Sequence, residues 1–215
     1  PRPMTEYYLE ICRWLGLSLP ADPRPSLFFS TDAARKAAQL LAGCGIQPGD
    51  MVIGLNPGAK FGSSKCWPPE YFGALCDRLA TAWPCKLILF AGPGEAPLTA
   101  RVAQNTTAPV IDTGPQRVDL ALLKPLIRRC QLLITNDTGP RHYAVALGVP
   151  VVVLMGPTDP RYTGMNLEKT RVIRQELDCA PCHAKICPLG HHACMTAITP
   201  EQVLGECRQL LRDVA

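Results

Sequence analysis

The sequence predicts an α/β protein with a Rossmann-like parallel sheet and helices on both faces. Short segments such as "MVIGL" and "VPVVVLMG" are continuously apolar, which is typical of strands buried on both faces of a parallel sheet. They alternate with helical stretches of about 10 to 15 residues, the pattern of βαβ units. A chain of 215 residues with 47% hydrophobic and 19% charged residues is large and apolar enough to bury such a core.

Residues 1–48 precede this pattern and are predicted to form interdomain helices and a linker. An apolar stripe with nearly helical spacing predicts an amphipathic helix over residues 5–17. Three prolines in "PADPRPS" then interrupt the chain. A second helix is expected to begin with Thr31 or Asp32 as its cap and to run through Leu41.

Residues 49–215 are predicted to form one Rossmann-like domain that ends in a helix. The carboxyl ends of parallel strands bound the ligand crevice of such a sheet, and the loops after the strands lie there. The predicted strands are "MVIGL", "CKLILFAG", "APVIDTG", "QLLITND" and "VPVVVLMG", and the predicted helices lie in "PPEYFGALCDRLATA", "PGEAPLTARVAQNT", "DLALLKPLIRRC" and "GPRHYAVALG".

Charge and hydropathy exclude some classes of protein. The net charge is only +4 and the 22 Lys and Arg residues are scattered, so no nucleic-acid partner is expected, although a local anionic ligand is compatible. No apolar segment approaches the roughly 20 residues that span a bilayer, and no signal peptide is recognisable. The chain begins at Pro1 without an initiator Met and is interpreted as a fragment or a trimmed form of a longer chain.

The loop "NPGAKFGSSKCW" follows the first predicted strand and carries candidate ligand-binding residues. Its glycines permit close backbone approach, while its hydroxyls and one lysine lie near the start of the next helix, where anions bind readily. The alternative is an ordinary connecting loop with a solvated lysine, because a lone Gly-rich stretch is a weak signal. The candidates are Asn56, Gly58, Ser64 and Lys65.

Two other turns at the same predicted edge carry acidic or hydroxyl side chains. "FAGPGE" presents Glu95, which could accept hydrogen bonds from ribose or sugar hydroxyls. The alternative is a glutamate favoured only by the dipole of the following helix. "PTDP" places Thr158 and Asp159 at the same crevice.

The turn "TNDTGPRHYA" is the strongest candidate for an anion site. Asp137 and Thr138 could cap the helix, and Gly139 exposes backbone N–H groups. His142 lies in the first turn, where the helix dipole favours an anion. Together these groups would bind a diphosphate. A simple capping turn with an incidental histidine is the alternative.

Four ordered motifs carry a resemblance to a known family. "GLNPGAKFGSSKCWPPEYF", "FAGPGE", "NDTGPRHYAVALGVPVVVLMGPTDP" and "DCAPCHAKICPLGHHACMTAITPEQVL" resemble the ADP-heptose:lipopolysaccharide heptosyltransferases of glycosyltransferase family 9, most closely the heptosyltransferase II type. The resemblance covers roughly residues 50–210 and implies the C-terminal, nucleotide-sugar-binding half of a two-domain GT-B enzyme.

The resemblance implies a function and a role for each motif. The complete enzyme would be an inverting transferase that moves heptose from ADP-heptose to the inner core of lipopolysaccharide, with no required cofactor. Its catalytic base would lie in an N-terminal acceptor domain that has no counterpart in this chain. The enzyme would be cytoplasmic, at the inner face of the inner membrane of a Gram-negative bacterium, with membrane contact through the missing half.

The resemblance also implies roles for single residues. Lys65 and His142 would act in catalysis, and Lys65 would contact the phosphate or sugar of the donor. Glu95 would bind the ribose. The diphosphate and heptose would be held by Asp137, Thr138, Gly139 and His142.

Residues 179–194 hold a compact group of cysteines. Cys179 and Cys182 form a CxxC pair, and Cys187 and Cys194 follow at wider spacing. Four thiolates could bind a structural zinc ion or an iron-sulfur centre. The alternatives are reduced structural thiols, or disulfides in an oxidised sample. We expect an ordered flap beside the donor site, held by cysteine pairing or by a metal.

Two other functions are compatible with the sequence. One is a stand-alone nucleotide-sugar-binding module that works with a separate acceptor-binding chain. The other is an epimerase-like GT-B half that binds a different nucleotide and performs no transfer.

Overall fold

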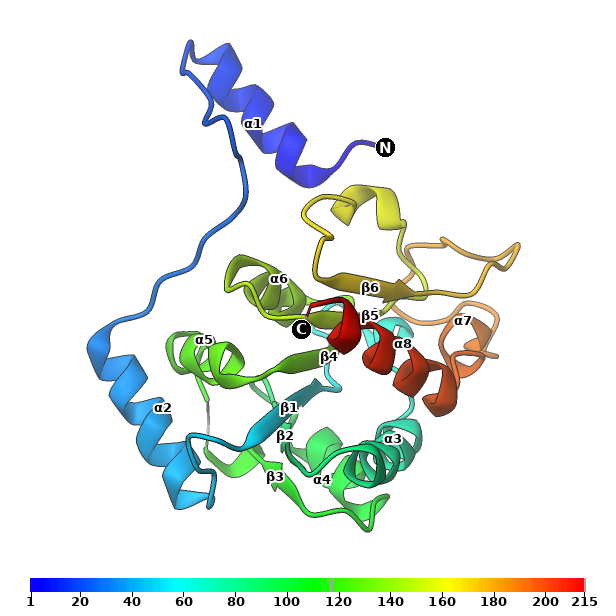
Figure 1. Cartoon of the computed structure of the whole chain (residues 1–215). Coiled ribbons are helices and arrows are strands. Elements are labelled where there is room, and N and C mark those ends of the chain that lie inside the picture. The colour runs from blue at the N-terminus through cyan, green and yellow to red at the C-terminus, as the bar shows by residue number, and fades with distance from the viewer. Residues whose placement is uncertain (117, 215) are drawn as a thin grey trace.

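A single parallel sheet organises the chain in the computed structural model, which describes residues 1–116 and 118–214. Its six strands lie in the order β3-β2-β1-β4-β5-β6, and every neighbouring pair is parallel (Figure 1). The predicted Rossmann-like α/β class is confirmed. The strands are β1 (Met51–Asn56), β2 (Cys85–Leu89), β3 (Val110–Asp112), β4 (Leu132–Asn136), β5 (Val151–Leu154) and β6 (Thr170–Ile173).

Helices cover both faces of the sheet, as expected from strands that are apolar throughout. One core lies between the sheet and α3, α4 and α8, and a second lies between the opposite face and α2, α5 and α6. The helices are α1 (Met4–Trp14), α2 (Thr31–Gly43), α3 (Pro69–Ala82), α4 (Ala96–Gln104), α5 (Leu120–Arg129), α6 (Gly139–Ala146), α7 (Ala193–Thr196) and α8 (Pro200–Asp213), with short 3-10 turns η1 (Ser63–Lys65), η2 (Gly114–Gln116) and η3 (Pro160–Thr163).

The order of the strands creates a switch point in the middle of the sheet. From β1 the chain winds outward through β2 to β3, then returns to place β4 on the other side of β1. From β4 it winds outward in the opposite direction to β6. Loops that leave β1 and β4 therefore diverge, and a crevice opens between them at the carboxyl edge.

Two local features differ from the sequence prediction. Strand β6 was not predicted, because its sequence TRVI contains Thr170 and Arg171 and lacks the apolar run of β1, β2, β4 and β5. The cap of α2 is Ser30, whose hydroxyl accepts a hydrogen bond from the Ala33 N–H at 3.1 Å. The prediction of Thr31 or Asp32 as the cap was wrong, since both residues already lie inside the first turn.

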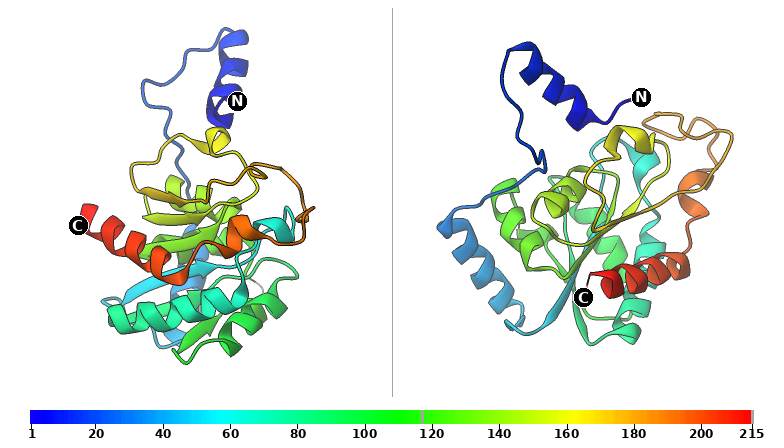
Figure 2. Two further views of the ribbon diagram at one scale, coloured as in Figure 1. Left: turned by 90° about the vertical axis from the view of Figure 1, so that its right-hand side faces the viewer. Right: turned by 45° about the horizontal axis from the view of Figure 1, so that its top comes forward.

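The two N-terminal helices differ in how they pack. Helix α2 buries Ala33, Ala37 and Leu41, and it contacts α5, so it packs as part of the α/β unit. Helix α1 stands apart from the sheet (Figure 2) and buries no residue; Trp14 is 85% exposed. The predicted role of residues 1–48 as interdomain helices and linker stays a prediction, and residue 215, the predicted domain end, lies outside the described residues.

None of the helices in the described part of the chain combines the length and the hydropathy needed to cross a bilayer.

Candidate functional site

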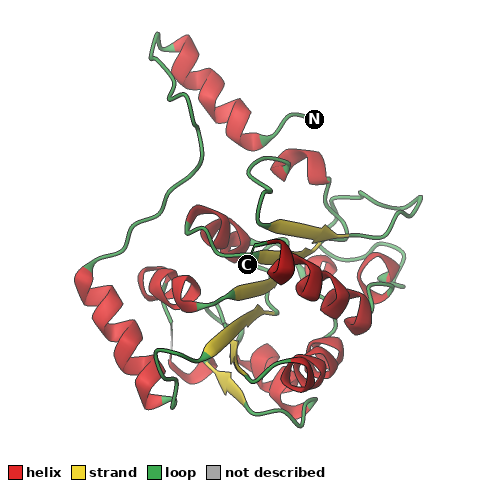
Figure 3. Cartoon of the chain, viewed as in Figure 1, coloured by secondary structure: helices red, strands yellow, loops and turns green. Residues whose placement is uncertain are grey.

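The candidate site lies where β1 and β4 end. The predicted ligand residues come from the loops after β1, β2 and β4, and those loops meet at one edge of the sheet (Figure 3). The turn after β5 joins them there through Thr158. The parallel register of β1 and β4 pairs Asn56 with Thr135, so the two loops start side by side.

Asp137 is the centre of a buried polar network. Its Oδ2 lies 2.7 Å from the Lys65 ammonium and accepts the Thr158 hydroxyl at 2.7 Å. Its Oδ1 accepts a hydrogen bond from the Arg141 guanidinium at 2.7 Å, one helical turn along α6. Lys65 also donates to the Asp137 carbonyl at 2.9 Å. Only 13% of the Lys65 side chain and 2% of the Arg141 side chain are exposed, so the network is shielded from water.

Two cations keep the Asp137 carboxylate ionised. Burial alone would raise its pKa, but Lys65, Thr158 and Arg141 outweigh burial and lower the pKa to about 2. The carboxylate therefore acts as the counter-ion that fixes Lys65. It does not cap α6: Thr138 occupies the cap position, and no side chain bonds to the helix start. The prediction that Thr138 caps the helix is confirmed for its position but not for a side-chain hydrogen bond, and the prediction for Asp137 was wrong, because its carboxylate is bonded to Lys65, Arg141 and Thr158.

The N-terminus of α6 consequently faces the crevice without a side-chain cap. The Gly139 N–H has no acceptor within the helix and carries partial positive charge, whereas Pro140 has no N–H and the Arg141 N–H donates to the Thr138 carbonyl at 3.1 Å. A Cβ built at Gly139 would meet no atom within 4 Å, so the space in front of this backbone is open. The uncapped Gly139 N–H, open space and the nearby Lys65 ammonium form the setting in which proteins bind phosphate.

His142 lies one turn into α6 and is exposed. It lines a cavity of about 240 Å³ whose other walls come from the start of α1 and from η3, including Met4 and Tyr162. The desolvating effect of the surrounding protein and the charge of the adjacent Arg141 lower the pKa of His142. The imidazole is therefore neutral at physiological pH, and it can donate or accept a hydrogen bond.

Glu95 connects the loops that follow β1 and β2. Its Oε2 accepts a hydrogen bond from the Gly92 N–H at 2.7 Å. Its carboxylate also lies over Gly58, where a Cβ would come within 2.1 Å of the Glu95 Cδ. Gly58 is thus required for the approach of Glu95, as well as being a predicted ligand residue. A cavity of about 460 Å³, lined by Gly92 and Gly114, lies at the same turn.

The side chains of Asn56 and Ser64 form hydrogen bonds to other groups of the protein. The buried Asn56 amide donates to the Gly58 carbonyl at 3.2 Å and to the Thr135 hydroxyl at 3.3 Å, which ties the β1 loop to β4. The Ser64 hydroxyl donates to the Ala184 carbonyl at 2.5 Å. The structure therefore gives both side chains a role in holding the loop, whereas the sequence predicted them to contact the ligand.

Comparison with known proteins identifies the family. The sequence model of Glycosyltransferase family 9 (heptosyltransferase) matches residues 3–193. The chain belongs to this family. Lipooligosaccharide heptosyltransferase 2 of Campylobacter jejuni subsp. jejuni serotype O:2 is 33% identical over 171 residues, which cover 78% of this chain and 53% of the relative. The family predicted from the four motifs is confirmed.

Solved structures of family 9 proteins show the same architecture. A glycosyl transferase family 9 protein from Veillonella parvula is 27% identical with a TM-score of 0.86, and the match covers 99% of this chain and 60% of that chain. The ADP-heptose lps heptosyltransferase II of E. coli is 28% identical with a TM-score of 0.73, covering 92% of this chain and 57% of that chain. The chain spans about half the length of the relatives it matches.

Arg141 was not among the site residues predicted from the sequence of this family 9 chain. The arginine is almost fully buried and also donates to Thr163 in η3, so it joins the β4 turn to the loop after β5. The available signal was its position four residues after Asp137, a spacing at which opposite charges meet on a helix. Lys65 was predicted as a ligand residue, but its pairing with Asp137 across 72 residues of chain could not be inferred from the spacing.

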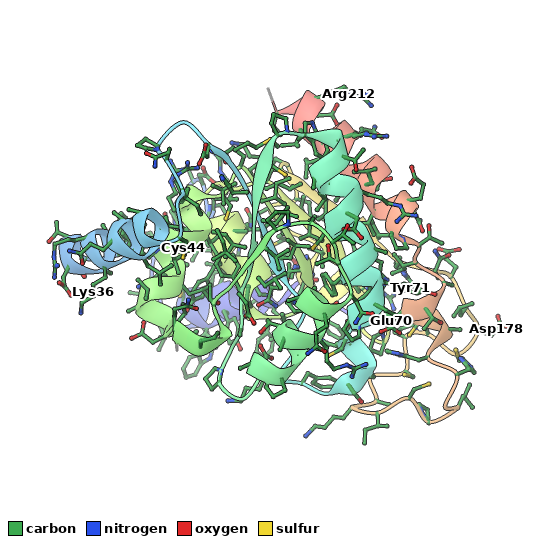
Figure 4. The ribbon with its side chains drawn as sticks, turned by 90° about the horizontal axis from the view of Figure 1, so that it is seen from below. Lys36, Cys44, Glu70, Tyr71, Asp178 and Arg212 are labelled. Carbon is green, nitrogen blue, oxygen red and sulfur yellow. The ribbon has the colours of Figure 1, made fainter. Side chains whose placement is uncertain are left out.

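The cysteine-rich segment of this family 9 chain packs beside the Lys65 loop. The Ser64 N–H donates to the Lys185 carbonyl at 3.1 Å, and the Nε2 of His192 lies 2.8 Å from the Ser64 carbonyl. In the view of Figure 4 the segment lies at the same end of the molecule as Glu70 and Tyr71, in the first turn of α3. The segment is thus ordered beside the Lys65 loop, and its predicted place beside a donor site stays a prediction.

The four cysteines of the segment are free thiols that line one small cavity of about 20 Å³. Backbone N–H groups of His192 and of residues 189–191 point at the Cys187 sulfur and lower the pKa of that thiol. Burial raises the pKa of the Cys194 thiol. As these side chains are oriented, no three His, Cys, Asp or Glu residues within 1–116 and 118–214 form a ready metal site.

Proposed function

We propose that this chain is the donor-binding half of an inverting heptosyltransferase that takes heptose from ADP-heptose. One observation carries the proposal: the Lys65 ammonium and the uncapped N-terminus of α6 lie together at the switch point of the sheet. A diphosphate needs cationic and N–H donors in this arrangement. The relatives are heptosyltransferases, and ADP-heptose is named for the E. coli structure.

The diphosphate is placed across the start of α6. The N–H groups around Gly139 bind its oxygens, and Lys65 supplies the positive charge. Asp137 does not approach the anion; it holds Lys65 and is itself neutralised by Arg141, which prevents repulsion of the phosphate. The buried network thus orients a cation before the ligand arrives, and preorganised charge of this kind stabilises a leaving diphosphate.

The nucleoside and the sugar are placed on opposite sides of the diphosphate. Glu95 accepts the ribose hydroxyls beside the cavity lined by Gly92 and Gly114. His142 faces the heptose from the cavity near α1, where its neutral imidazole donates a hydrogen bond to a sugar or phosphate oxygen. This placement of nucleoside, diphosphate and sugar follows the order of the β2, β4 and α6 segments along the edge of the sheet.

The transfer step is a direct displacement at the anomeric carbon. An acceptor hydroxyl oxygen forms the new bond to that carbon while the bond to the phosphate oxygen breaks and ADP leaves. The hydroxyl proton passes to a base in the acceptor-binding half. The negative charge that develops on the ADP oxygen is stabilised by Lys65 and by the start of α6.

The complete protein is proposed to act on the inner core of lipopolysaccharide at the cytoplasmic face of the inner membrane. Support comes from the substrate class named for the relatives, lipooligosaccharide or lipopolysaccharide. The acceptor and the membrane are assigned to the other half of a GT-B enzyme, and no nucleic acid or required cofactor takes part.

Calorimetric titration of the chain with ADP, UDP and GDP tests the donor assignment. We expect ADP to bind most tightly, and equal affinity for UDP would contradict the assignment. In a second titration, His142→Ala should weaken binding of ADP-heptose more than binding of AMP, because His142 is placed beside the diphosphate and sugar. Equal losses for both ligands would remove that role from His142.

A further inference from the structure

The cysteine-rich segment holds a cluster that the donor site does not use. Cys179, Cys182, Cys187 and Cys194 come from 16 residues of sequence and line one common cavity of about 20 Å³. That volume is about the size of one water-sized sphere. Four thiols around one atom-sized space is the ligand set of a tetrahedral thiolate site.

Ordinary core packing accounts for Cys194, which is 8% exposed and lies in the core beside α8, but not for Cys179, Cys182 and Cys187. Cys76, Cys130 and Cys207 are typical core cysteines, each at most 4% exposed among apolar neighbours. In contrast, Cys182 is exposed, and the hydrophobic residues beside the cluster, Ile186 and Leu189, are 73% and 61% exposed. Because the segment has little apolar burial of its own, a cross-link would supply the stability that a core gives elsewhere.

Both sides of the segment are fixed to the body of the protein. Hydrogen bonds with Ser64 fix it to the β1 loop, and the Lys185 carbonyl lies so close to Gly62 that a Cβ there would come within 2.2 Å. On the other side, the His183 N–H donates to the Pro157 carbonyl at 2.8 Å. The Cys194 sulfur lies 2.8 Å from the position of a Cβ on Gly156, at the end of β5.

The four cysteines line the same cavity, and rotation of a side chain about its first torsion to another rotamer re-aims each sulfur within it.

We propose that Cys179, Cys182, Cys187 and Cys194 bind one thiophilic metal ion, zinc or iron, as four thiolates, and that this site fixes the loop that carries Lys65. On binding, each thiol that ligates the metal releases its proton to solvent, and four metal–sulfur bonds form. The metal takes no part in transfer. Ser64 connects the two regions: its backbone and hydroxyl contact the segment, and Lys65 follows it directly. The effect of the metal on the loop that carries Lys65 rests on the proposed function, whereas the metal site itself does not.

Metal analysis of the purified chain tests the site. The protein is prepared under reducing conditions without chelator, and zinc and iron are measured by mass spectrometry. We expect one equivalent of one metal, lost in Cys182→Ser and retained in Cys44→Ser, a cysteine outside the segment. Cys182 is exposed, so its substitution leaves the core intact. Absence of stoichiometric metal, with thiol titration showing disulfides or free thiols, overturns the proposal.

Cobalt substitution identifies the ligands. Co²⁺ added to the metal-free chain should give the absorption of a tetrahedral ion together with thiolate-to-cobalt charge transfer. Cys182→His replaces one sulfur by nitrogen, so it should keep the metal and weaken the charge-transfer band. A spectrum without thiolate charge transfer would contradict the site.

ADP titration then tests the coupling to the donor loop. Removal of the metal should weaken ADP binding roughly tenfold, the effect of losing one charge-assisted hydrogen bond. The chelator should leave ADP binding by the metal-free Cys182→Ser variant unchanged. Metal without any effect on ADP contradicts only the coupling. If the chain binds ADP but holds no metal, the metal site is contradicted and the proposed function stands. If the chain holds the metal but does not bind ADP, the proposed function is contradicted and the metal site stands.

Discussion

Asp137 and Glu95 are both carboxylates at the carboxyl edge of the sheet, but their surroundings are opposite. Asp137 is buried against Lys65 and Arg141, and both of its oxygens are occupied. Glu95 is half-buried, and its carboxylate accepts a single backbone N–H from Gly92. The sequence assigned both residues to the ligand. The comparison shows that an acidic residue at this edge can be fully occupied as an internal counter-ion or keep an oxygen without a cationic partner, depending on which cations the fold brings to it.

The largest expected effect is on stability. Asp137→Ala leaves two buried cations without a counter-ion, which costs about 3–5 kcal/mol of unfolding free energy. Glu95→Ala removes one hydrogen bond and should cost about 1 kcal/mol. Urea unfolding followed by circular dichroism measures both variants. Equal losses of unfolding free energy in the two variants would show that Asp137 is no more important to the fold than Glu95.

A second expected effect is the dependence of stability on pH. The pKa of Asp137 is about 2 in the folded chain and about 3.9 in an unfolded one. Its carboxylate therefore contributes roughly 2–3 kcal/mol above pH ~4, and this contribution is lost as the pH falls through 2. Asp137→Asn lacks the titrating group, so the stability difference between the parent chain and this variant should shrink across that window. Parallel curves would show that the network does not stabilise the ionised form.

The role of Glu95 is tested by removing its charge and the hydroxyls that it is proposed to bind. Glu95→Gln should weaken ADP binding roughly tenfold, because a hydrogen bond to a charged acceptor contributes about 1.5 kcal/mol. The same substitution should leave the affinity for 2′,3′-dideoxy-ADP unchanged. A loss for both nucleotides would indicate that Glu95 acts by holding the loop over Gly58 instead.

The smallest expected effect concerns the backbone of α6. Gly139→Ala adds a methyl group in open space, so the fold should be unaffected, while a bound diphosphate would be displaced from the N–H groups. Loss of one such hydrogen bond weakens ADP binding about fivefold. Gly205→Ala in α8 is the matched control, since a Cβ there also meets nothing within 4 Å. If both variants bind ADP like the parent, the diphosphate does not lie on α6.

Periodicity and turn residues were sufficient to predict the sheet and the edge at which the candidate residues gather. Strands β1, β2, β4 and β5 contain runs of apolar residues, and such runs are visible in a single sequence, whereas β3 has only two apolar residues before Asp112. Strand β6 lacks such a run, so its pattern is weak. The cap of α2 was misplaced by one residue because Ser30, Thr31 and Asp32 are all good caps.

The hydrogen-bond partners of the site residues could not be predicted from the spacing of residues along the sequence. Ser64 was expected to face an anion, but it bonds to Ala184, 120 residues further along the chain. The occupation of Asp137 by Lys65 likewise depends on the meeting of two loops in space. Residue types at an edge can be predicted locally, whereas their division into ligand groups and internal supports requires the fold.

The position of β4 beside β1 has a consequence for folding. The other four strand pairings join consecutive strands, but Asn56 and Thr135, which meet across this pairing, lie 79 residues apart in the chain. Closing a longer loop loses more chain entropy, so this contact is expected to form after the pairings on either side of it. In pulsed hydrogen exchange, β1 and β2 would then be protected from exchange before the amides that join β1 to β4. The crevice at their carboxyl ends would be the last part of the sheet to assemble.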